Sequence, residues 1–141
     1  MSAVRISCAA YAALAVMSFA PSAVASGDLS GQWVGNSQLD GKNSDAKTTL
    51  VLGPPDAADS MLRLEERSTC VLRGGRYTAA ADGGWSLSFK EGSGSDACAR
   101  LARGAFTLQQ GSSPRSLQFD VTYPGPDGKA NLRRGLLSRY P

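Results

Sequence analysis

The carboxylates are the side chains with most capacity for acid–base chemistry in this sequence, because its 141 residues include no histidine. Without an imidazole, the chain lacks Ser-His-Asp and Cys-His nucleophilic sites, and also the usual ligands of catalytic zinc. Acid–base work would fall to aspartate, glutamate, lysine or tyrosine. An enzymatic role would therefore need two carboxylates that lie close together in a cleft.

Two pairs of carboxylates are close in sequence but are not placed as a catalytic dyad. Glu65 and Glu66 are adjacent on a predicted strand, so their side chains point to opposite faces. Asp56 and Asp59 follow a Pro-Pro dipeptide, in a segment typical of a solvated turn. We therefore predict no catalytic residues and a protein that is not an enzyme.

The polar loop after the first predicted strand contains oxygen ligands that calcium could use. They belong to Asp40, Asn43, Ser44 and Asp45, which lack the alternating register of an EF-hand loop. A polar hairpin tip explains the same residues, and we predict no metal site. The glycine-rich run 92–95 is interpreted as a flexible loop, because no Gly-Lys-Ser/Thr follows it, so no cofactor is expected.

The candidate binding patch is a group of arginines that follow two cysteines in the sequence. Its members are Arg73, Arg76, Arg100 and Arg103. A solvated basic rim is the competing and simpler interpretation of this patch. The formal net charge of the whole chain is only +3, so we expect no nucleic-acid partner.

The first 25 residues have the features of a secretory signal peptide. Arg5 gives a positive start, residues 6–20 are apolar, and Ala23-Val24-Ala25 matches a cleavage motif before Ser26. An uncleaved anchor helix is the alternative, although a membrane span needs about 20 apolar residues. We predict one exported domain, residues 26–141, in the periplasm or outside the cell, with no membrane span after cleavage.

Two of the three cysteines would remain after cleavage, because Cys8 leaves with the signal peptide. Cys70 and Cys98 are bound for an oxidising compartment and allow a single pairing. A free thiol or a redox pair is the alternative, but the spacing is not Cys-x-x-Cys and no histidine can activate a thiolate. We predict a structural disulfide, which would stabilise the fold by roughly 3–4 kcal/mol.

Eight short runs with period-two alternation follow the signal peptide, and turn-forming clusters separate them. The runs are residues 29–36, 47–52, 61–67, 70–77, 85–90, 104–110, 117–123 and 131–140. One or two helical turns are expected in residues 95–103, with Ser95 or Asp96 as the cap. Together these features predict an all-β, antiparallel, eight-stranded up-and-down β-barrel, which removes exposed edges; a two-sheet sandwich is the alternative.

The side chains expected to point into the barrel are nearly all bulky and apolar. They are Trp33, Leu50, Leu52, Leu64, Trp85, Leu87, Phe89, Phe106, Leu108, Leu117, Phe119, Val121, Tyr123 and Leu136. An eight-stranded barrel is just wide enough to be filled by side chains or to hold one small ligand. This set favours a filled interior, and therefore a protein that binds through its surface.

The first predicted strand contains Gly31-Gln32-Trp33, and Gly-x-Trp at this place resembles the calycin superfamily of lipocalins, fatty-acid-binding proteins and avidins. In those barrels the tryptophan closes one end, and a basic side chain from the last strand packs across it. The resemblance implies structural roles for Gly31 and Trp33, with Arg139, or else Arg133 or Arg134, as the basic partner. Such a guanidinium–indole contact would contribute about 0.5–2 kcal/mol.

Two narrower resemblances involve longer stretches. CVLRGGRYTAA and GGWSLSFKEG resemble the middle strands of avidin-like barrels, but Phe89 stands where that family has a tryptophan, so no biotin binding is expected. Residues 29–33, LSGQW, resemble the first strand of periplasmic metalloprotease inhibitors, which are small calycin barrels. We therefore expect a binding module that acts on another protein through its loops, as an inhibitor of a secreted hydrolase in the most specific form. A carrier of a small apolar ligand in a lipocalin-like lumen is the alternative.

Overall fold

The computed structural model of the chain describes residues 29–42 and 45–141. The predicted signal peptide, residues 1–25, and its cleavage site before Ser26 lie outside the described residues. The described chain forms nine strands and one short helix, in the order β1 (Gly31–Leu39), β2 (Asp45–Leu52), β3 (Ser60–Glu65), β4 (Thr69–Ala79), β5 (Trp85–Ser88), β6 (Glu91–Ser93), α1 (Asp96–Ala102), β7 (Ala105–Gln110), β8 (Ser116–Pro124) and β9 (Ala130–Arg139).

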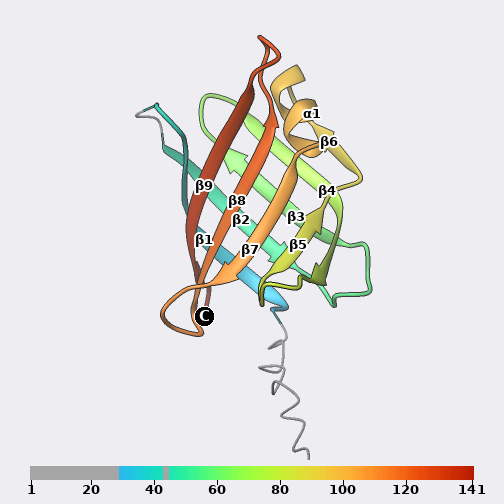
Figure 1. Ribbon diagram of the computed structural model, residues 1–141, viewed down its shortest axis with the longest axis vertical. Helices are drawn as coiled ribbons and strands as arrows, with labels where there is room; N and C mark the ends of the chain where they lie inside the picture. Colours follow the sequence, from blue (N-terminus) through green and yellow to red (C-terminus); the bar gives the residue numbers. More distant parts are fainter. Residues whose placement is uncertain (1–28, 43–44) are drawn as a thin grey trace, which may run out of the picture.

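The strands form a closed antiparallel barrel (Figure 1). Consecutive strands pair from β1 to β5 and from β7 to β9, β5 pairs with β7, and β9 returns to pair with β1 to complete the circle. The short strands β5 and β6 both pair with β4, and together they occupy a single place in the barrel. The predicted eight-stranded up-and-down barrel is confirmed, and the sandwich alternative is not.

The predicted strand 85–90 differs from the structure at its C-terminal end. Pairing with β4 is interrupted after Ser88, the Lys90 backbone N–H donates to the Arg73 carbonyl, and β6 then pairs with residues 71–73. The interpretation of residues 92–95 as a flexible loop is therefore wrong for its first two residues. The physical reason is a close approach: a Cβ on Gly92 would lie 2.8 Å from the Leu72 side chain and 3.0 Å from that of Ala102.

A β-bulge at Gly74 bends β4. Ser60 pairs with Gly75 and Leu62 pairs with Leu72, so β4 has one more residue than β3 between these two positions. Gly74 has a φ of +68°, a conformation that glycine adopts without strain. The bend lets one strand pair with β3 along one edge and with both β5 and β6 along the other.

The barrel interior is filled by side chains. Thirteen of the fourteen residues predicted to point inward are buried, and the exception is Leu136, which is 73% exposed. Leu137 is buried in its place, because the inward positions of β9 are Arg133, Gly135, Leu137 and Arg139. The ring of Phe119 occupies the space that a side chain at position 135 would need. A shift of one residue moves every side chain of a strand to the opposite face, so the prediction for Leu136 was wrong.

The helix α1 covers one end of the barrel and is fixed there by the predicted disulfide. Cys70 at the start of β4 is bonded to Cys98 in α1, with their Cα atoms 5.5 Å apart. The Ser95 hydroxyl accepts a hydrogen bond from the Cys98 backbone N–H, which makes Ser95 the N-cap, as expected. Leu101 and Ala102 are buried against the core. The helix is therefore a fixed part of this end of the barrel.

Candidate functional site

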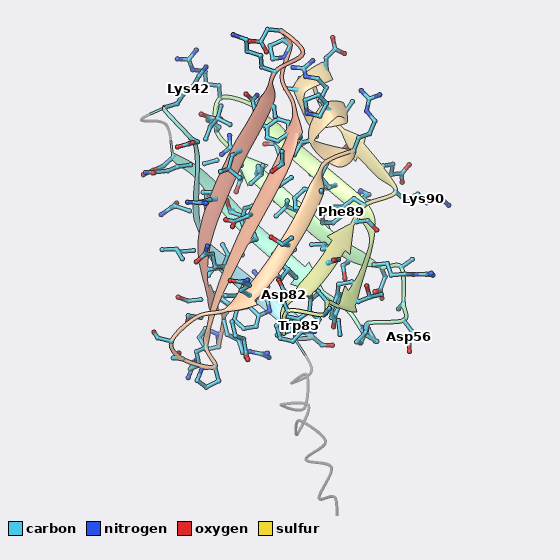
Figure 2. The ribbon with its side chains drawn as sticks, viewed as in Figure 1. Lys42, Asp56, Asp82, Trp85, Phe89 and Lys90 are labelled. Carbon is cyan, nitrogen blue, oxygen red and sulfur yellow. A yellow bond between two sulfur atoms is a disulfide. The ribbon has the colours of Figure 1, made fainter. Side chains whose placement is uncertain are left out.

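The two ends of the barrel differ, and two arginines on the inward face of β9 mark the difference. Arg133 and Arg139 are separated by six residues, or about 20 Å of strand. Arg133 lies toward the end that carries α1, which we call the helix end. Arg139 lies toward the opposite end, which we call the tryptophan end. Figure 2 shows Lys42 at the helix end, with Asp56, Asp82 and Trp85 at the other.

The tryptophan end is closed by Trp33 and Arg139. The Arg139 guanidinium carbon lies 4.6 Å from the centre of the Trp33 ring, and Trp33 is completely buried. Arg139 Nη1 donates to the Ser30 carbonyl at 2.9 Å, and Trp33 Nε1 donates to the Leu29 carbonyl at 2.9 Å. Gly31 has a φ of +131°, and a Cβ there would lie 3.3 Å from Arg139 Nη1. The structure thus brings together the three residues to which the sequence assigned structural roles.

The helix end contains a cavity of about 510 Å³. Its exposed rim comes from three connecting segments: Lys42 follows β1, residues 66–68 join β3 to β4, and residues 95 and 97 begin the helix region. Its buried walls and floor are formed by Leu64, Cys98, Leu101, Tyr123 and Arg133, with Leu39 and Cys70 partly buried. The cavity is therefore a recess at the mouth of a barrel whose interior is otherwise packed.

Arg133 is the buried charge of this cavity, and its side chain is incompletely paired. The residue is 6% exposed. Its Nη1 donates to the carbonyl and hydroxyl oxygens of Ser37 at 3.4 and 3.2 Å. Its Nη2 lies 3.7 Å from Glu66 Oε2, and its Nε is buried with no hydrogen-bond partner among the described residues. Because a guanidinium has five N–H donors, Arg133 retains capacity to bind an anion.

The cavity offers binding chemistry for an anion. Its charged residues are Lys42, Arg67 and Arg133 against the single carboxylate of Glu66. The two cysteines in its wall are joined as a disulfide. No group of three or more His, Cys, Asp or Glu residues in the described part of the chain is arranged to hold a metal ion. The lining is therefore suited to a carboxylate or a similar anion.

The candidate patch predicted from the sequence lies outside this cavity. Arg73 and Arg76 are exposed on β4, and Arg73 lies opposite Glu91 in the register of β4 with β6. Arg100 is on α1, with its Nε buried and without a hydrogen-bond partner in the described structure, and Arg103 is exposed just after the helix. None of the four lines the cavity as described. The patch therefore stays a prediction without a recess to support it.

The acidic residues singled out in the sequence have different surroundings in the structure. Glu65 pairs with Arg63 at 3.1 Å, whereas Glu66 faces Arg133, consistent with their expected opposite directions. Asp56 and Asp59 are exposed in the segment between β2 and β3. Asp45 accepts a hydrogen bond from Gln38 Nε2, and residues 43–44 of the polar loop lie outside the described residues.

Sequence reasoning missed the site residues Arg133, Glu66 and Tyr123. Arg133 was considered only as a partner for Trp33, because the calycin resemblance implies a basic side chain of the last strand across that ring. A signal was present in β9: Arg133 lies four residues before Leu137 and six before Arg139, and even spacing on a strand places all three side chains on the same face. This spacing predicts an inward Arg133 only when Leu137, and not Leu136, is taken as the buried residue of the strand.

Comparison of the chain with protein-family models, with curated proteins and with solved structures found no match. Within residues 29–42 and 45–141, no helix has the length and apolar character that crossing a membrane would require.

Proposed function

We propose that this chain is an exported, non-enzymatic binding module that holds another protein at the helix end of its barrel. The observation that carries the proposal is the contrast between the filled interior and the 510 Å³ recess at the helix end. The recess is bordered by residues from three separate connecting segments. Loops on a rigid scaffold are where proteins commonly place their binding residues.

The rim of the cavity supports a protein partner over an apolar small molecule. Lys42, Arg67 and Ser68 are exposed polar residues, and the floor contains the charged Arg133. A lipocalin-like carrier would need an apolar lumen, which here is occupied by residues such as Phe119 and Leu108. A small-molecule carrier remains the second candidate, because 510 Å³ lies within the usual volume of ligand pockets.

Export and a calycin-like architecture are parts of the same proposal. The disulfide between Cys70 and Cys98 is of the kind that forms and persists in oxidising compartments. The stacking of Arg139 on Trp33 is the contact that the calycin resemblance implies. Inhibition of a secreted hydrolase is the specific activity that we propose for the module.

The test is capture of a partner from the native envelope and culture medium with a matched pair of variants. Arg67→Glu changes an exposed arginine on the cavity rim, and Arg115→Glu makes the same change in the exposed β7–β8 turn at the tryptophan end. We expect the wild type and Arg115→Glu to capture one common protein and Arg67→Glu to lose it. If that protein is a hydrolase, its activity should fall on addition of the wild type.

Two results would overturn the proposal. Absence of any stable protein partner would reject the module as a protein binder. Equal capture by Arg67→Glu and Arg115→Glu would reject the helix end as the binding surface. A small molecule that copurifies with the wild type in native mass spectrometry would favour the carrier instead.

A further inference from the structure

We propose that the cavity at the helix end receives a carboxylate from an acidic segment of the partner protein, with Arg133 as its anchor. This inference rests on the proposed function, since it names the chemistry recognised at the same end of the barrel. It depends on the pairing of Arg133, the position of Glu66 and the charge of the rim.

Arg133 is held in place by weak partners and leaves donors for a ligand. Its hydrogen bonds to Ser37 are 3.2 and 3.4 Å long, at and beyond the upper end of the usual N–H···O range. Ser37 is itself fixed, because its hydroxyl accepts a hydrogen bond from Thr48 Oγ1 at 2.9 Å. These contacts orient the guanidinium from the barrel side. The Nη2 group is within ion-pair distance of Glu66 alone among the described carboxylates.

Glu66 occupies the place that a ligand carboxylate would take. Its Oε2 lies 3.7 Å from Arg133 Nη2, which is too long for a hydrogen bond. The Glu66 side chain is 37% exposed, whereas that of Arg133 is 7% exposed, so Glu66 can turn into solvent at little cost. A ligand carboxylate could then form the short, charge-assisted contacts with the guanidinium that Glu66 does not make. Glu66 therefore acts as a displaceable internal competitor.

The rim favours a peptide segment over a free apolar acid. Lys42 and Arg67 attract negative charge at the entrance, and the exposed Ser68 and Ser95 offer hydroxyls to a peptide backbone. An apolar acid would gain most from walls that exclude water, and this entrance is polar. The fitting ligand is a short segment that presents one aspartate, glutamate or terminal carboxylate.

The experiment is a titration of the oxidised protein followed by the amide chemical shifts of the cavity residues. The probes are the blocked peptide Ac-Ala-Glu-Ala-NH2, its neutral isostere Ac-Ala-Gln-Ala-NH2, and butyrate as a free acid. The variants are Arg133→Met, which removes the anchor, and Glu66→Gln, which removes the competitor from an exposed position. We expect the Glu peptide to bind at least 10-fold more tightly than the Gln peptide and than butyrate. We expect Glu66→Gln to tighten Glu-peptide binding by at least 3-fold and Arg133→Met to abolish it.

Three results would overturn the inference. Equal binding of the Glu and Gln peptides would show that the carboxylate is not recognised. Weaker binding of the Glu peptide by Glu66→Gln would show that Glu66 is not a competitor, even if Arg133→Met failed to fold. Tighter binding of butyrate than of the Glu peptide would assign the site to free carboxylic acids. If peptide selectivity fails while partner capture still depends on Arg67, only this inference falls. If selectivity holds without any captured protein, the proposed function falls and so does the protein source of the carboxylate, while recognition of a carboxylate by the cavity stands.

Discussion

The guanidinium carbon of Arg139 lies 4.6 Å from the centre of the Trp33 ring, and the two side chains together close one end of the barrel. Arg139 is also hydrogen-bonded to the chain just ahead of β1, through the Ser30 carbonyl. Six residues earlier on the same face, Arg133 borders a cavity instead. One strand thus contributes a satisfied arginine to the closed end and an incompletely paired arginine to the open end.

We expect Trp33→Ala to lower the free energy of unfolding by about 3–5 kcal/mol, because it removes a large side chain that is fully buried. The substitution also removes the ring beneath Arg139 and the hydrogen bond from Nε1 to the Leu29 carbonyl. Urea denaturation measures the change. Trp33→Phe, which keeps a ring, should cost less. A loss below about 1 kcal/mol for Trp33→Ala would show that Trp33 does not support the barrel end.

The register of β9 gives a prediction that adjacent leucines test directly. Leu137 is 2% exposed and Leu136 is 73% exposed. Leu137→Ala should therefore lower the free energy of unfolding by about 2–5 kcal/mol, whereas Leu136→Ala should change it by less than about 0.5 kcal/mol. Thermal or urea unfolding of the two variants provides the comparison. The reverse order would mean that β9 is shifted by one residue and that Arg133 faces solvent.

The strands of this fold are predictable from sequence because period-two alternation reports which face of a strand is buried. The alternation is clear in β8, where Leu117, Phe119, Val121 and Tyr123 are all buried. It is ambiguous in β9, where Leu136 and Leu137 are adjacent and the correct face contains Arg133 and Gly135. Hydrophobicity alone cannot choose between such faces, since the choice depends on Phe119 packing over Gly135.

The candidate site was less predictable than the fold for a related reason. The cavity is formed by connecting segments and α1 at the helix end, and strand periodicity does not predict how those segments pack together. The disulfide was predictable because only one pairing was available, and it fixes α1 at this end. The proximity of Glu66 to Arg133 brings the segment between β3 and β4 next to β9, which is far away in the sequence, so no local pattern indicated it.

The buried position of Arg133 predicts that its removal separates binding from stability. A buried guanidinium loses hydration, and its partners here, Ser37 and Glu66, return only long contacts. Arg133→Met replaces the charge with an apolar side chain of similar length and leaves Glu66, whose side chain is 37% exposed, free to turn into water. We expect the free energy of unfolding of Arg133→Met to lie within about 1 kcal/mol of the wild type or above it, with carboxylate binding abolished. Urea denaturation alongside the peptide titration measures both quantities. A loss of more than about 2 kcal/mol would show that Arg133 stabilises the barrel. A structural role would then account for the buried arginine without a ligand.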